Sequence, residues 1–155
     1  MSLIRDLYTV FDREYARHVA RRSSKNSLLQ ELKRNLAFLR EGLAGQVTPE
    51  VLIDGLEDRQ FRSALESGFR FDSLQRQRLT RSTCDGVPAF ERYHGWSSEQ
   101  LICKVYERVA ILQKLKQGGS GVDLGLRLQN LFKLMMLVTA HLEGRQLQVR
   151  RSQRD

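Results

Sequence analysis

Arginines interleaved with aromatic residues are the feature of this sequence that most clearly indicates a binding function. Residues 59–81 contain six arginines and only two acids, a net charge of +4, and Phe69 and Phe71 lie among them. Guanidinium groups bind phosphates or carboxylates, and aromatic rings stack on nucleic-acid bases. We therefore predict a site for nucleic acid or another acidic partner. Its expected residues are Arg70, Arg76, Arg78, Arg81, Arg150 and Arg151. The alternative is a solvated basic face whose arginines pair with local carboxylates.

The distribution of charge along the chain supports this choice of segments. The formal net charge is +8 over 155 residues, yet residues 1–58 carry nine basic and nine acidic groups and sum to zero. Residues 82–144 add only +1, and residues 145–155 add +3. Nearly all of the excess positive charge thus falls in residues 59–81 and in the C-terminal tail.

One arginine–histidine pair has the spacing of a nuclease motif. Arg13 and His18 are separated by four residues, which resembles the Arg-x4–6-His signature of the HEPN ribonucleases, themselves small helical bundles. The resemblance implies cleavage of an RNA phosphodiester at a dimer interface, with His18 as general acid or base and Arg13 stabilising phosphate charge. Arg13 is followed by Glu, where the family usually has Asn, Asp or His. On one straight helix the two side chains point about 140° apart, and the neighbours Tyr15 and Val19 favour a histidine at the edge of the core.

A second candidate site is an aromatic cluster in the middle of the chain. Phe90, Arg92, Tyr93 and Trp96 have the composition of an interaction hot spot. The alternative is a small satellite core that anchors a loop onto the main body.

Metal-binding and nucleophile motifs are not found in the sequence. Cys84, His94 and Cys103 are ten and nine residues apart, whereas structural zinc sites use closely spaced ligand pairs. Neither a nucleophile elbow nor a phosphate-binding loop is present. We predict no metal and no cofactor, and the sequence favours a non-enzymatic protein.

Hydrophobic periodicity predicts an all-α fold with a core like a four-helix bundle. The long helices are expected at residues 3–20, 27–43, 98–116 and 122–143. The third is apolar almost all round, which predicts that it lies at the centre of the core.

Residues 46–96 are expected to form an irregular insertion with short helices between the second and third long helices. Thr48-Pro49 and Asp58 have the residue types that begin such helices. The sequence predicts one domain over residues 1–144, followed by a disordered basic tail over residues 145–155.

Helix-start signals support the expected boundaries of two long helices. Ser27 with Gln30, and Ser97 with Gln100, have the spacing of a capping box. We expect one long helix to begin at Ser27 and another to begin directly after Ser97.

Composition limits the class of protein further. Two cysteines are too few for a disulfide-stapled secreted scaffold, and no secretory signal is visible at the N-terminus. The most apolar stretch, residues 124–142, contains Arg127 and Lys133 and is too polar to span a membrane. These features predict a soluble cytoplasmic protein, and twenty arginines against six lysines hint at a bacterial source.

Apolar residues outside the main helical seams suggest association. Phe38, Met136 and Leu137 either pack under the insertion or form a contact surface. We predict a non-enzymatic interaction or accessory module that forms a homodimer and binds an acidic protein, RNA or DNA through its basic patch. The alternative is a nucleic-acid-binding protein, including a HEPN-like ribonuclease that uses Arg13 and His18.

Overall fold

The computed structural model describes residues 3–19, 26–84, 87–119 and 121–147, and the regular structure in these ranges is helical. The elements are α1 (Leu3–Val19), α2 (Ser27–Ala44), α3 (Pro49–Gly55), α4 (Arg59–Glu66), the 3-10 helices η1 (Phe71–Ser73), η2 (Arg81–Cys84) and η3 (Pro88–Tyr93), α5 (Ser98–Gly118) and α6 (Leu124–Leu142). No strand occurs within the described ranges, so the predicted all-α class is confirmed. The long helices lie where the periodicity placed them, with ends shifted by one or two residues.

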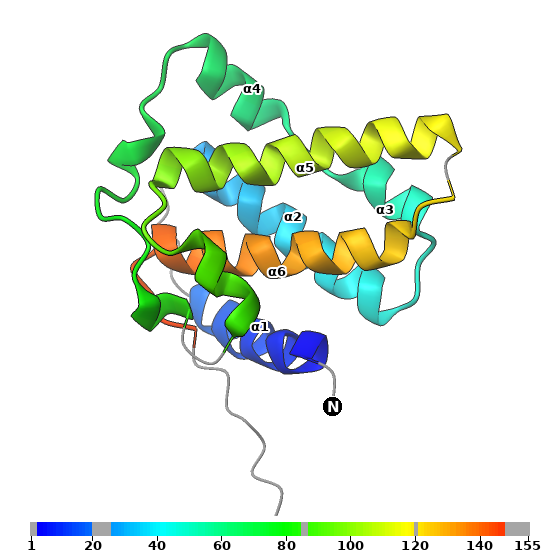
Figure 1. Ribbon diagram of the computed structural model, residues 1–155, viewed down its shortest axis with the longest axis horizontal. Coiled ribbons are helices and arrows are strands. Elements are labelled where there is room, and N and C mark those ends of the chain that lie inside the picture. Colours follow the sequence, from blue (N-terminus) through cyan, green and yellow to red (C-terminus); the bar gives the residue numbers. More distant parts are fainter. Residues whose placement is uncertain (1–2, 20–25, 85–86, 120, 148–155) are drawn as a thin grey trace, which may run out of the picture.

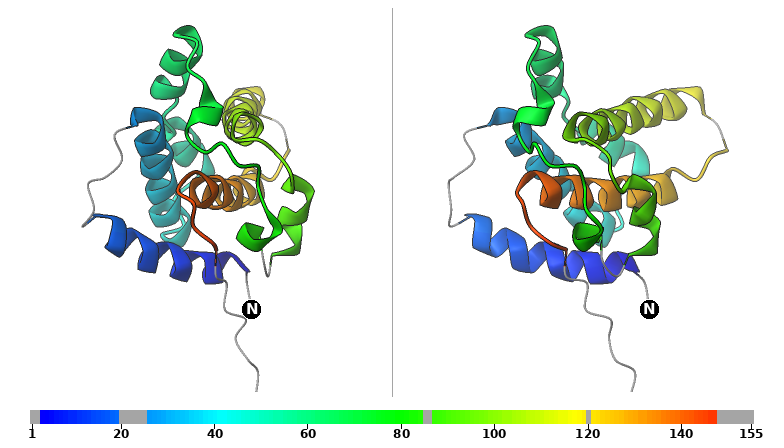
Figure 2. Two further views of the ribbon diagram at one scale, coloured as in Figure 1. Left: turned by 90° about the vertical axis from the view of Figure 1, so that its left-hand side faces the viewer. Right: turned by 60° about the vertical axis from the view of Figure 1, so that its left-hand side comes forward.

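Helix α6 lies at the centre of the molecule, with α1, α2 and α5 around it (Figure 1; Figure 2). Twelve of its nineteen residues are buried, whereas α5 buries one face and leaves Ile111 exposed. The prediction that residues 98–116 form the central helix is therefore wrong. A helix with neighbours on several sides needs an apolar surface nearly all round, and α6 meets that requirement in this fold.

The surplus apolar residues of α6 are used inside the molecule. Met136 and Leu137 are both buried. The Tyr8 and Phe11 rings of α1 meet the Phe132 ring of α6 in edge-to-face geometry, with ring centroids 5.3 and 6.3 Å apart. The surplus on α6 therefore packs against neighbouring helices, while Phe38 of α2 remains partly exposed.

The two long-helix starts differ in how they are capped. At α5 the predicted capping box is present, because the Ser97 side chain accepts from the Gln100 N–H and the Gln100 side chain accepts from the Ser97 N–H. At α2 the predicted box of Ser27 and Gln30 is wrong. Asn26 is the N-cap, and its Oδ1 accepts from the backbone N–H groups two and three residues further on, at 2.9 and 3.2 Å. An asparagine caps a helix as well as a serine does.

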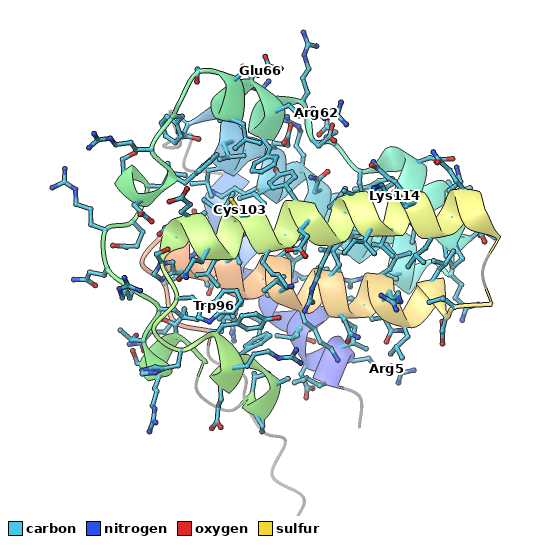
Figure 3. All side chains as sticks on the ribbon, turned by 45° about the horizontal axis from the view of Figure 1, so that its top comes forward. Arg5, Arg62, Glu66, Trp96, Cys103 and Lys114 are labelled. Atoms are coloured by element: carbon cyan, nitrogen blue, oxygen red, sulfur yellow. The ribbon has the colours of Figure 1, made fainter. Side chains whose placement is uncertain are left out.

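Helix α4 is capped by a side chain from another helix. Asp58 occupies the predicted N-cap position but makes no side-chain cap hydrogen bond. Glu31 of α2 accepts instead from the backbone N–H groups of Gln60 and Phe61, at 2.7 and 3.2 Å. Glu31 also accepts from the Tyr106 hydroxyl at 2.8 Å and is 1% exposed. We call these groups the α4 junction; they fix a short helix that stands out from the bundle (Figure 1), with Arg62 and Glu66 on its outer surface (Figure 3).

The part of the insertion that follows α4 packs against the long helices. Leu79 is buried, its N–H donates to the Trp96 carbonyl at 2.9 Å, and its carbonyl accepts from the Gly95 N–H at 2.9 Å. Val87 and Phe90 are buried as well. The backbone pairing therefore ties two parts of the insertion to each other, and its buried apolar side chains anchor it in the core.

The first residues of the predicted tail also contact the body. Leu147 is buried, and Arg145 forms ion pairs with Glu143 at 2.7 Å and with Glu14 at 3.3 Å. Residues 148–155 lie outside the described residues.

Candidate functional site

A groove of about 530 Å³ lies between η3, α5 and α6. Helices α5 and α6 run side by side and are joined at one end by a short connection (Figure 1). Residues distant in the sequence therefore face each other across the groove. Its lining consists of Ala89, Phe90, Arg92, Tyr93, Lys104, Arg108, Ile111, Leu112, Leu126, Arg127, Asn130, Lys133 and Leu134. We call this site the basic groove. A volume of this size is in the range that binds small molecules or the side chains of a partner.

Helical periodicity explains which residues line the basic groove. On α5, Lys104, Arg108 and Ile111 follow one another at spacings of four and three and therefore share one face. On α6, Asn130 and Lys133 lie three residues apart and share the corresponding face. Each helix thus packs its buried face against the core, and the residues at the edge of that face line the groove.

The wall formed by η3 is locked to α5 by a polar contact. The Arg108 guanidinium donates to the Tyr93 hydroxyl at 2.8 Å. The Tyr93 ring meets the Trp96 ring edge to face, with centroids 4.9 Å apart, and the Arg92 guanidinium lies 5.5 Å from its centroid. This chain of contacts holds the aromatic wall in one position.

All the charged residues that line the basic groove are positive. Five of its lining residues are cations, and none is a carboxylate: the cations are Arg92, Lys104, Arg108, Arg127 and Lys133. Among the described residues, the only ion pair made by these five joins Lys104 to Glu107 at 3.7 Å, one turn along α5. The other four form no ion pair with a described residue, and such cations beside an apolar surface attract an anion that also has an apolar part.

The structure places three residues of the predicted aromatic hot spot in this groove. Phe90, Arg92 and Tyr93 are among its lining residues, whereas Trp96 supports the Tyr93 ring from outside it. The same residues also pack against the core, because Phe90 and Tyr93 are buried. The cluster therefore serves as both a satellite core and a wall of the groove.

The arginines of the predicted basic patch lie elsewhere. The side chains of Arg70, Arg76, Arg78 and Arg81 are exposed, and none lines the basic groove. Arg78 donates to the Gly95 carbonyl at 2.9 Å, so it helps to hold the insertion in place. The other two predicted members, Arg150 and Arg151, lie outside the described residues.

The nuclease-like pair lies on α1. Arg13 is exposed on this helix. His18 belongs to the last turn of α1, and its side chain lies outside the described part of the structure.

A serine and a histidine that are far apart in the sequence meet in the core. The Ser98 hydroxyl lies 3.2 Å from His141 Nε2, a distance at which a base can activate a nucleophile. The same hydroxyl donates to the Gln75 carbonyl at 2.6 Å, and both side chains are buried. Burial lowers the pKa of His141, while a hydrogen bond to the Gln77 backbone partly opposes this shift. We interpret the pair as a structural tie between the insertion, α5 and α6.

Metal ligands and an activated thiol are not found in the described part of the chain. No group of three or more His, Cys, Asp or Glu side chains is placed there to hold a metal ion. Burial and the nearby charge of Glu99 raise the pKa of the Cys103 thiol, which disfavours the thiolate, the reactive form.

Comparisons with protein-family models, curated proteins and solved structures find no match to this chain. None of the helices in the described ranges has the length and apolar composition needed to cross a membrane.

The four groove cations on α5 and α6 were missed as site residues by the sequence analysis: Lys104, Arg108, Arg127 and Lys133. Their signal was present in the spacing of polar residues at the edge of each apolar face. The Gly-rich connection after α5 also indicates that the two helices return antiparallel, which would bring these edges together.

Proposed function

We propose that this protein is a non-enzymatic binding module whose basic groove binds an acidic partner. The observation that carries the proposal is the lining of the groove, with five cations, no carboxylate and an apolar floor. The Ser98 hydroxyl, the one candidate nucleophile beside a histidine described above, donates to a backbone carbonyl, which favours a structural role for the Ser98–His141 pair.

Self-association in the cytoplasm is part of the same proposal, through a surface other than the groove. A second copy also carries a net charge of +8, which opposes insertion into a cluster of cations. Phe38, Val47 and Val51 are exposed apolar residues on or next to α2 and α3. This surface is the better candidate for a homodimer, and light scattering at high protein concentration tests it, because a strictly monomeric mass contradicts the dimer.

The test of the groove compares two double variants with the same change in charge. Labelled poly-L-glutamate is titrated with the protein and followed by fluorescence anisotropy at several salt concentrations. We expect Arg127→Glu with Lys133→Glu to weaken binding about tenfold or more, because each reversal places a like charge against the polymer. The control is Arg76→Glu with Arg81→Glu, outside the groove, which we expect to change affinity less than about twofold. No binding by the unmodified protein, or greater loss in the control, would overturn the proposal.

RNA binding by the exposed arginines is the second candidate. Arg70, Arg76 and Arg81 are exposed and form no ion pair with any described residue, which suits contact with phosphates. The same titration with a labelled RNA oligonucleotide distinguishes this function, because the Arg76→Glu, Arg81→Glu variant would then lose affinity and part of the salt dependence. Cleavage of the RNA, lost in His18→Ala, would support the nuclease alternative.

A further inference from the structure

The accessible apolar surface of the basic groove is aliphatic. Ile111 and Leu126 are 40% and 52% exposed, whereas the aromatic side chains Phe90 and Tyr93 are only 2% and 4% exposed. A ligand entering the groove therefore meets branched aliphatic side chains, one from each long helix, and little aromatic surface. Covering exposed side chains of this kind favours a partner with apolar side chains of its own.

Because α5 and α6 run antiparallel (Figure 1), Ile111 and Leu126 lie at the same end of the groove, and the cations continue from there along both helices. Lys104 and Arg108 stand one turn apart on α5, and Arg127 and Lys133 stand on α6. The lining spans residues 104–112 of α5 and 126–134 of α6, and each stretch is about 12 Å long at 1.5 Å per residue. The groove therefore matches a little over two turns of a partner helix.

These features disfavour nucleic acid as the occupant of the groove. Single-stranded nucleic acid gains affinity by stacking bases on open aromatic faces, and the Tyr93 ring is buried between Trp96 and Arg92. The exposed aliphatic side chains would face phosphates and sugars with no apolar surface to cover them. A protein helix, in contrast, presents an apolar stripe with charged residues at its edges.

We propose that the basic groove binds an acidic amphipathic helix of another protein. This inference rests on the proposed function and specifies its partner. Neighbouring apolar side chains of the helix, at positions i and i+3 or i+4, contact Ile111 and Leu126 at this end of the groove, and its Asp and Glu residues pair with the cations along α5 and α6. The Tyr93–Trp96 contact places the single tryptophan one residue layer behind the site, so binding changes its fluorescence.

The experiment uses the full-length protein and three labelled probes of equal charge. The first is a designed peptide of about 14 residues with leucines in one stripe and glutamates on either side. The second has the same composition in an order without the stripe, and the third is a single-stranded oligonucleotide. We expect the amphipathic peptide to bind about tenfold more tightly than either of the others, and to gain helical circular dichroism on binding.

Two variants locate the apolar contact. We expect Ile111→Ser with Leu126→Ser to weaken binding of the amphipathic peptide about tenfold. Leu65→Ser removes an exposed leucine on α4, outside both the groove and the proposed dimer surface, and we expect it to change affinity less than about twofold. Thermal unfolding of both variants verifies that they are folded, since all three positions are exposed.

The outcomes separate this inference from the proposed function. If both peptides bind equally, and the Ile111, Leu126 variant binds as the parent does, the groove accepts acidic chains in general and the helix proposal is overturned. Tighter binding of the oligonucleotide, lost in the groove variants, overturns it in favour of nucleic acid. If none of the three probes binds, both proposals fail.

Discussion

The α4 junction and the basic groove use charge in opposite ways. At the junction, Glu31 is almost completely buried and receives three hydrogen bonds from groups of the same chain. In the groove, five cations lie with exposed aliphatic side chains. The single ion pair that these cations form with a described residue is the 3.7 Å contact between Lys104 and Glu107 on α5.

The difference shows which polar groups hold the fold and which are available to a partner. A buried charge is tolerable only when its hydrogen bonds are made inside the protein. Exposed cations need no such partner, because water solvates them, but their mutual repulsion weakens the fold slightly. Structural and binding roles are therefore distinguishable by the effect of substitution on stability.

The largest effect is expected at the α4 junction. Glu31→Ala leaves the Tyr106 hydroxyl and the first N–H groups of α4 without their buried acceptor, and we expect it to lower the free energy of unfolding by about 3 kcal/mol. Urea denaturation measures this loss. Tyr106→Phe, which removes only one of the three donors, is expected to cost about 1 kcal/mol. If Glu31→Ala is no more destabilising than Tyr106→Phe, Glu31 does not cap α4, and the α4 junction does not differ from the basic groove in its contribution to stability.

An intermediate effect is expected at His141, where burial lowers the pKa. Because the unfolded chain then binds the proton more readily than the folded chain, stability falls as the pH drops below about 6.5, the ordinary pKa of histidine. We expect the parent protein to lose stability between pH 7 and pH 5, and His141→Gln to show a flatter dependence whatever its stability at pH 7.

The pH range of this measurement lies above the range in which protonation of Glu143 lowers the stability. Ion pairs with Lys33 and Arg145 lower the pKa of Glu143 despite its burial. Its contribution to stability is present above the ordinary carboxyl pKa and is lost only at lower pH. The difference between the parent and His141→Gln, measured by chemical denaturation at fixed pH values between 5 and 7, therefore isolates His141, and parallel curves for the two proteins would contradict the assignment.

The smallest effect is expected in the basic groove. Lys133→Gln removes one of five neighbouring cations, and we expect it to change stability by no more than about 0.5 kcal/mol, in the stabilising direction at low salt. The gain should vanish at high salt, where repulsion between exposed charges is screened. Thermal melts at two salt concentrations measure this. A clear destabilisation would show that Lys133 is a structural residue, and the groove would then resemble the junction.

Most of the fold was predictable because local sequence carries the signals of long helices. The spacing of apolar residues located four helices to within one or two residues, and Ser97 with Gln100 marked the start of α5. The identity of the central helix was not predictable in this way. The apolar surface of α5 and that of α6 look alike along the chain, and the arrangement of their neighbours decides which is enclosed.

The candidate site was predictable in part. Phe90, Arg92 and Tyr93 were recognised from their composition and do line the groove. The remaining cations were overlooked because residues 82–144 sum to a charge of only +1. Their acids lie outside the groove, as with Asp123, which caps α6, and Glu143, which pairs with Lys33.

The helical class, the long helices and several of their ends follow from local sequence, because periodicity and capping act between residues within a few positions of one another. Only helix packing brings Glu31 to the start of a helix 28 residues away, at Arg59, and cations from three elements into one groove. Contacts of this kind depend on how helices pack in space, and net charge summed along the chain does not record them.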